Sequence, residues 1–235
     1  MTSHSYAGED LEVLAAMPNY HGWIMEEFGP FICGQVVEYG AGIGTMSAHL
    51  QRRADALTLV EPSTNLFHEL QRRFATASGV AVVNAPLESH VLEIAPASVD
   101  TIVLINVLEH VENDSLALRH LMNALRPSGH LLLFVPALNI LMSKLDRSLG
   151  HYRRYHRQDL LAKTRAAGGA IERCRYMDAF GVLPWFFLNT LLGSMSFDPR
   201  LVRFNDRYIV PLSQRAERRV APPFGKNLLL VARKA

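Results

Sequence analysis

An acidic residue followed by three glycines is the stretch of this sequence best suited to binding a charged small molecule. Glu38 ends an apolar run that begins at Val36, and Gly40, Gly42 and Gly44 follow at alternate positions. This pattern predicts a buried strand, a tight loop and the first turn of a helix. Glycine lets the backbone turn sharply and approach a ligand that a Cβ would block. A loop of this kind at a strand's carboxyl end is where an open α/β sheet binds a nucleotide-like ligand.

The order of the acid and the glycines indicates the charge of that ligand. The dinucleotide fingerprint G-x-G-x-x-G places its third glycine one position later than Gly44, where this chain has Thr45. The carboxylate of Glu38 would repel a pyrophosphate and attract a cation. S-adenosylmethionine, with its ammonium and sulfonium groups, meets this requirement, whereas a nicotinamide dinucleotide meets it poorly.

A second acid, Glu61, ends the next predicted strand, residues 56–61. It lies 23 positions after Glu38 (61 − 38), which is the spacing expected of an acidic side chain that receives two ribose hydroxyls. The alternative is a solvated strand end or a helix cap. Its position and neighbours favour ribose binding.

Several motifs in this order resemble those of class I S-adenosylmethionine-dependent methyltransferases, in their small-molecule, type 11/12-like bacterial branch. The similarity covers approximately residues 20–169. The motifs are Glu38–Gly44, Leu59–Pro62, Asp100–His110 and Leu125–His130. The resemblance implies an α/β, Rossmann-like fold: a seven-stranded, mostly parallel sheet with helices on both faces, an antiparallel last strand and a helical lid insertion.

The alternation of predicted strands and helices independently indicates a parallel sheet. Further strands are expected at residues 80–84, 101–106, 131–136 and 170–177, and the last at 227–233. We expect one domain over residues 1–235. Within it, residues 1–34 form a helical cap, and residues 137–157 and 178–222 form lid insertions on the acceptor side.

The resemblance also implies which residues contact the cofactor. Tyr20, just before the first strand, is expected to cover the methionine end. The adenine is expected near Pro86 and Leu87, although many similar enzymes have an aspartate near Ala85 that this chain lacks. The complete expected set is Tyr20, Glu38, Gly40, Ala41, Gly42, Gly44, Glu61, Pro62, Pro86, Leu87, Asn106, Val107 and His110.

Some methyltransferases bind a divalent metal through a Glu-x-x-Glu-His pattern at the position of residues 106–110. Here Asn106 removes one carboxylate, and the adjacent Glu109 and His110 are expected to point in different directions on a helix. We therefore expect no metal. His110 is equally well explained as a hydrogen-bonded structural residue or as a catalytic residue.

Catalytic side chains are expected in residues 150–156, Gly-His-Tyr-Arg-Arg-Tyr-His, which lie just beyond the fifth predicted strand. The segment resembles one in bacterial members of the superfamily. His151 is the candidate base, because histidine titrates near neutral pH. Arg153 or Arg154 would bind an anionic acceptor group, and Tyr155 completes the candidate set. The alternative is a basic loop that clamps the following helix through weak surface ion pairs.

The apolar stretch at residues 179–193 is too short and too interrupted, by Pro184 and Asn189, for a membrane span. It is interpreted as a packed lid or a homodimer surface. The alternative is an apolar mouth for a lipid-like acceptor or a peripheral membrane contact, aided by Arg200, Arg203 and Arg207.

Composition sets the remaining limits. The 235 residues are 49% hydrophobic and 20% charged, with a net charge of +2 that does not favour nucleic acid as a partner. The two cysteines and the lack of a secretory signal predict a cytoplasmic protein, with membrane association as the alternative. We expect a methyltransferase that acts by in-line displacement on a small-molecule or lipid-like acceptor. A catalytically silent subunit and a nicotinamide-dependent oxidoreductase are the alternatives.

Overall fold

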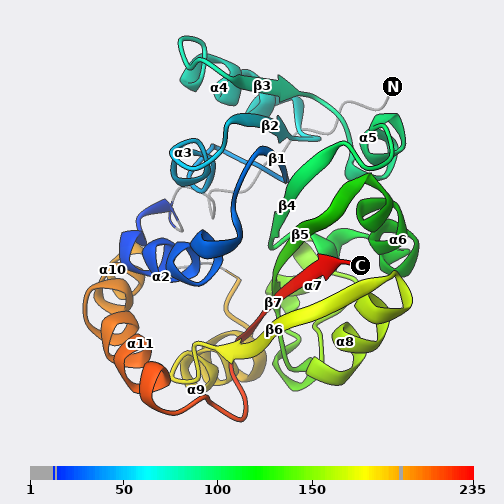
Figure 1. Ribbon diagram of the computed structural model, residues 1–235. Helices are drawn as coiled ribbons and strands as arrows, with labels where there is room; N and C mark the ends of the chain where they lie inside the picture. The colour runs from blue at the N-terminus through cyan, green and yellow to red at the C-terminus, as the bar shows by residue number, and fades with distance from the viewer. Residues whose placement is uncertain (1–12, 14, 196–197) are drawn as a thin grey trace.

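The apolar segments of the chain assemble into one sheet in a computed structural model that describes residues 13, 15–195 and 198–235 (Figure 1). Its order is β3-β2-β1-β4-β5-β7-β6. The strands are β1 (Gln35–Tyr39), β2 (Ala56–Val60), β3 (Val80–Val83), β4 (Val99–Ile105), β5 (Leu125–Pro136), β6 (Gly169–Met177) and β7 (Asn227–Lys234). β1 to β5 run parallel, and β7 lies antiparallel between β5 and β6. The predicted fold class and the antiparallel last strand are confirmed.

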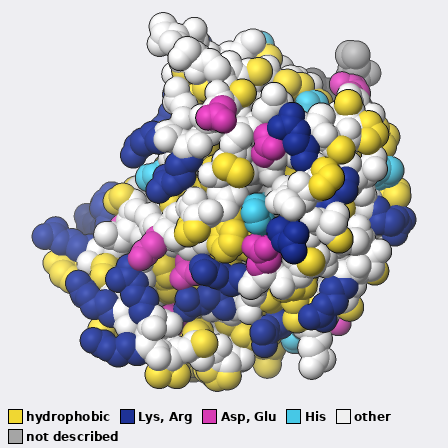
Figure 2. All heavy atoms as spheres, viewed as in Figure 1, with side chains coloured by type: hydrophobic (Ala, Val, Ile, Leu, Met, Phe, Trp, Pro, Cys, Tyr) yellow, Lys and Arg dark blue, Asp and Glu magenta, His cyan; other side chains and the backbone are white. Residues whose placement is uncertain are grey.

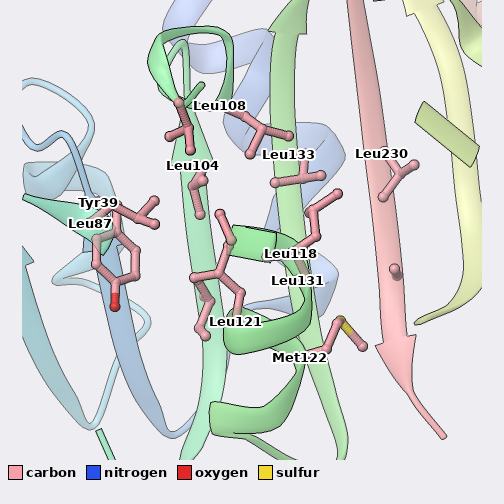
Figure 3. Close-up of a cluster of buried hydrophobic side chains, with 14 of the residues drawn as sticks. Tyr39, Leu87, Leu104, Leu108, Leu118, Leu121, Met122, Leu131, Leu133 and Leu230 are labelled. Atoms are coloured by element: carbon pink, nitrogen blue, oxygen red, sulfur yellow. The ribbon is translucent and has the colours of Figure 1, made fainter. Parts of the chain in front are cut away.

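Alternate residues of the central strands face opposite sides of the sheet, as strand geometry requires. In β4, Ile102 and Leu104 belong to one apolar core and Val103 to the other, and all three are fully buried. Figure 3 shows the first core, in which leucines of β4, β5 and β7 meet those of α6. Strands buried on both faces read as continuous apolar runs, which is why these segments were recognisable.

Helices cover both faces (Figure 1). The first face carries α5 (Leu87–Glu93), α6 (Asp114–Ala124) and α8 (Arg157–Ala166). The second carries α2 (Pro18–Phe28), α3 (Ser47–Leu50), α4 (Thr64–Arg73) and α11 (Val210–Arg219). The strand order reverses between β1 and β4, so their carboxyl ends form the switch point at which open α/β sheets bind ligands.

Short elements fill the segments in which lid insertions are expected. They are η3 (Asn139–Leu141), α7 (Lys144–Ser148), α9 (Val182–Trp185), the π-helix η4 (Phe186–Leu191), α10 (Pro199–Phe204) and the π-helix η5 (Asn205–Ile209). The 3-10 helices η1 (Gly29–Phe31) and η2 (Leu108–His110) precede β1 and follow β4. Of the expected cap, residues 1–12 and 14 lie outside the described residues, as do 196 and 197 of the second insertion.

β5 begins at Leu125, six residues before the predicted start. Arg126 lies in this added part of the strand, and its Nη1 is 2.8 and 2.7 Å from the two carboxylate oxygens of Asp100 in β4. Asp100 also accepts a hydrogen bond from the backbone N–H of Gln35. These contacts between distant residues join β1, β4 and β5 in the middle of the sheet, and the β4–β5 register shifts between Val99 and Thr101.

Removing a buried leucine from β4 tests this packing. Leu104→Ala should lower the free energy of unfolding by about 2–5 kcal/mol, because it leaves a cavity in the core. Leu92→Ala, at a side chain that is 64% exposed, should change it by less than about 0.5 kcal/mol. Urea unfolding followed by circular dichroism measures both. Equal effects would contradict the assignment of this core.

Candidate active site

The loop after β1 is held against the ends of two neighbouring strands. The backbone N–H groups of Gly40 and Ala41 donate to the carbonyl of Val60, at 2.8 and 3.3 Å. Gly40 has a φ of +67°, and a Cβ there would lie 2.4 Å from Cγ2 of Val107. Only glycine therefore allows this loop and the segment after β4 to approach so closely.

Glu38 places a buried carboxyl group beneath this loop. Its side chain is 3% exposed, and the Ser47 hydroxyl at the start of α3 donates to its Oε2 at 2.5 Å. Burial raises the pKa of Glu38 to about 8, and the nearby charge of Glu61 acts in the same direction. A cationic ligand beside it would favour the ionised form.

Glu61, at the end of β2, is 4% exposed and fixed by two backbone amides. Gly42 N–H donates to its Oε2 at 2.8 Å, and Ser63 N–H donates to its Oε1 at 2.9 Å. A carboxylate oxygen can accept two hydrogen bonds, so each retains capacity for a ligand hydroxyl. Asn84 fixes this turn by donating to the carbonyls of Glu61, at 2.8 Å, and Pro62, at 3.1 Å. Sequence reasoning did not identify Asn84 or Ser47. Their partners, Glu61 and Glu38, lie elsewhere in the sequence and come into contact with them only in the folded chain.

Three further residues expected at the cofactor, Asn106, Tyr20 and Leu87, are placed in different ways. Asn106 follows β4 with a φ of +54°. Tyr20 packs edge-on against Phe134, with ring centroids 6.1 Å apart, and its hydroxyl accepts a hydrogen bond from Asn227. The side chain of Leu87 packs into the core, so only backbone groups there could meet an adenine ring. Their contacts with a cofactor stay predictions.

On the acceptor side, Asp146 in α7 is a fully buried carboxylate that joins several elements. It accepts hydrogen bonds from Ser143 N–H and the Ser143 hydroxyl, at 2.7 and 2.6 Å, in a capping box. Its Oδ1 lies 3.0 Å from His151 Nδ1 and 2.8 Å from a terminal nitrogen of Arg154. These donors hold the pKa of Asp146 well below its usual range, although burial opposes them.

Two of the three predicted catalytic residues are engaged by the protein itself. Arg154 is 4% exposed, pairs with Asp146 and lies 4.7 Å from the ring centroid of Trp185. Tyr155 is 2% exposed, and its hydroxyl donates to the carbonyl of Leu108 or to Asp114. The geometry favours positioning roles for both side chains. Arg153 likewise binds the carbonyls of residues 111 and 112.

Glu109 and His110, expected to point in different directions, differ in burial, since Glu109 is buried and His110 is exposed, but they lie closer together than helical spacing alone suggests. One potential ligand atom from each of Glu109, His110 and His151 lies within 4.8 Å of the others. The reason is tertiary, because the segment after α7 folds over η2 and its Tyr152 N–H donates to the Glu109 carbonyl. His110 therefore lies against His151, with ring centroids 4.6 Å apart.

Comparison with known proteins identifies the family. A family model described as a methyltransferase domain matches residues 14–179, more than half of the chain. The chain belongs to this family. No curated protein matches it significantly. The family assignment gives no support to the nicotinamide-dependent alternative.

Solved structures confirm the fold of this methyltransferase-domain protein. An S-adenosylmethionine-dependent methyltransferase from Mesorhizobium loti is 17% identical, with a TM-score of 0.62, and the match covers 89% of this chain and 95% of that one. A second, from Archaeoglobus fulgidus, is 12% identical with the same TM-score, covering 97% and 100%. The cyclase SpnF is 17% identical, with a TM-score of 0.61, covering 92% and 79%. The fold is that of class I methyltransferases, and at these identities it does not specify the reaction.

The two buried glutamates predict how stability depends on pH. Burial also raises the pKa of Glu109 to about 8, from a reference value of 4.5 that applies to Glu38 as well. The folded state therefore holds these protons more tightly than the unfolded state. The associated stability is present below pH 4.5 and is lost as pH rises to about 8, by about 1.4 kcal/mol per pH unit per group.

Urea unfolding of Glu38→Gln between pH 5 and 8 should consequently show a shallower loss of stability than the native protein shows. Glu69→Gln, at an exposed position of α4, is the matched control and should keep the native slope. An unchanged slope in Glu38→Gln would contradict the raised pKa of Glu38.

Proposed function

We propose that this protein transfers the methyl group of S-adenosylmethionine to a lipid-like acceptor. The observation that supports the cofactor is the pair of buried acids, Glu38 and Glu61, on either side of the glycine loop. Glu61 has hydrogen-bonding capacity for ribose hydroxyls, and Glu38 offers negative charge for the ammonium or sulfonium group. These features of the site fit the cofactor that the family implies.

S-adenosylmethionine held by Glu38 and Glu61 would supply an electrophilic methyl group for in-line displacement by an acceptor's electron pair, with the sulfur as the leaving group. The protein's task is to align the acceptor, exclude water and remove a proton where the acceptor carries one. Asp146 fixes Nδ1 of His151 and leaves its Nε2 directed toward Glu109, 4.0 Å away. In the protein without a metal ion, we assign proton handling at the acceptor to this His151–Glu109 pair.

A lipid-like acceptor is supported by the surface beyond this pair. Trp185 in α9 donates to the carbonyl of Leu141 and lies over Arg154, so the apolar segment begins beside the candidate catalytic residues. Large apolar side chains that are 43–75% exposed lie on either side of Trp185 in the sequence, on α9, η4, α10 and η5 and between η4 and α10. We call these residues the apolar face: Leu183, Phe187, Leu188, Leu191, Leu192, Met195, Leu201, Phe204 and Tyr208.

The charge around the apolar face favours a membrane surface with anionic lipids. Arg200, Arg203 and Arg207 are exposed on α10 and η5. Figure 2 shows Lys and Arg side chains interspersed with hydrophobic ones at the end of the molecule where α10 and α11 lie. Within the described residues, no helix is both long enough and apolar enough to cross a bilayer. An apolar surface edged by arginines suits peripheral binding, with its hydrophobic side chains inserted among the headgroups.

Vesicle flotation tests the apolar face. The protein should float with phosphatidylglycerol-containing vesicles and less well with phosphatidylcholine alone. Leu191→Ser/Leu192→Ser should reduce the bound fraction at least about tenfold, because each buried leucine contributes about 1.5–3 kcal/mol. Leu92→Ser, equally exposed but on α5, is the matched control.

The acceptor itself is tested by incubating the protein with tritium-labelled S-adenosylmethionine and a membrane extract. Label should enter the organic phase. Label only in the water-soluble fraction would contradict a lipid-like acceptor and leave methyl transfer intact.

In the flotation experiment, a different outcome would reassign the apolar face. If the double serine variant dissociates a dimer without affecting vesicle binding, the apolar face is a contact between copies of this chain.

A further inference from the structure

The side chain of Glu109 is the least satisfied charged group in the described part of the chain. It is 0% exposed, and neither carboxylate oxygen has a hydrogen-bond partner among the described residues. An unpaired buried carboxyl group costs several kcal/mol, so native proteins normally give it a partner or a proton. Burial accordingly raises its pKa to about 8.

Two imidazoles lie beside this carboxyl group. The potential ligand atoms of Glu109, His110 and His151 are all within 4.8 Å of one another, so small side-chain rotations would bring them around one ion. His110 is exposed and His151 is partly buried, so the cluster opens toward solvent on one side. The buried Glu109 lies on the opposite, interior side of the cluster.

The orientation of His151 is set by a second carboxylate. Asp146 Oδ1 lies 3.0 Å from Nδ1, which favours that nitrogen as the donor, and Nε2 lies on the side of Glu109, 4.0 Å from its Oε1. A carboxylate that orients an imidazole in this way is the usual outer shell of a metal-binding histidine.

The local charge also favours a cation. The buried groups here include two carboxylates, Glu109 and Asp146, and one guanidinium, Arg154. Arg154 is held by Asp146, at 2.8 Å, and acts on Glu109 through its charge alone, without a hydrogen bond. One negative charge is left over when Glu109 is ionised.

We propose that Glu109, His110 and His151 bind one divalent transition-metal ion of the zinc class. Two imidazole nitrogens and one carboxylate oxygen form a donor set that suits Zn²⁺, whereas Mg²⁺ prefers an all-oxygen shell. Three protein ligands leave a coordination position open for an acceptor oxygen or water. In the metal-loaded protein, His151 is a ligand, and the metal lowers the pKa of the acceptor hydroxyl instead. This catalytic consequence depends on the proposed function, but metal binding does not.

Zinc titration of the metal-stripped, full-length protein tests the site without acceptor or cofactor. Calorimetry with ZnCl₂ should show one ion per chain, with MgCl₂ giving no comparable binding. Glu109→Gln and His110→Ala should each weaken zinc binding by more than about 100-fold, since even outer-shell partners are worth about 10–100-fold. His110 is exposed, so its replacement leaves the core unaltered, and glutamine is a neutral isostere of the protonated acid.

Matched controls come from the same segments. Glu112→Gln and His156→Ala remove an exposed acid and an exposed imidazole nearby and should leave zinc affinity unchanged. X-ray absorption of the zinc-loaded protein should show two imidazole ligands. Zinc affinity that is absent in the native protein, or equal in Glu109→Gln, would overturn the inference, and Glu109 would then be a buried acid that shares its proton with His151. A protein that binds S-adenosylmethionine but not zinc would refute the metal site and leave the proposed function standing.

Discussion

The acceptor side of this protein depends on one buried negative charge, the carboxylate of Asp146. Burying a carboxylate is costly unless hydrogen bonds and an opposite charge compensate it. Here the compensation comes from the capping box of α7, from His151 and from Arg154. These donors come from two separate segments, so the same charge that begins α7 also aims the imidazole and anchors the guanidinium beneath Trp185. Removing it would release all of them together.

The cofactor side is built on a different principle. There, the backbone N–H groups of Gly42 and Ser63 fix Glu61, and the Ser47 hydroxyl donates to Glu38. Burial raises the pKa of Glu38, whereas a surplus of donors lowers that of Asp146. The two carboxyl groups therefore differ in protonation near neutral pH because of their surroundings alone. A ligand that brings positive charge to Glu38 would favour its ionised form, which is the form that Asp146 already has.

The parts of the site that are local in sequence could be predicted, and the parts made by distant contacts could not. Three glycines after an acid, and a second acid at a strand end, carry their signal within a few residues, and the structure brings them together. The start of β5 was misplaced because Arg126 is held by Asp100, 26 positions away. Likewise His151 meets His110 across 41 positions (151 − 110), a distance over which neither helical spacing nor strand alternation gives any signal.

The same limit applies to the role of each residue. Arg154 and Tyr155 have side chains suitable for catalysis. The sequence alone does not show that Arg154 pairs with Asp146 or that the Tyr155 hydroxyl lies within hydrogen-bond distance of Asp114. Conversely, Glu109 and His110 were considered as part of a metal-binding pattern and set aside, and only the fold shows that the Glu109 carboxyl group has no hydrogen-bond partner among the described residues. Burial and the partners of polar atoms are properties of the assembled chain.

Calorimetric titration with S-adenosylmethionine, S-adenosylhomocysteine and NADH, on the native protein and on Glu61→Gln, tests the central claim most directly. We expect the first two to bind at one site per chain and NADH not to bind. Glu61→Gln should weaken both by about 10–100-fold, because hydrogen bonds to a charged group are worth about 1.5–3 kcal/mol. Glu88→Gln, exposed on α5, should bind like the native protein. Binding of NADH in place of the other two, or equal affinities in Glu61→Gln, would contradict the proposed cofactor site.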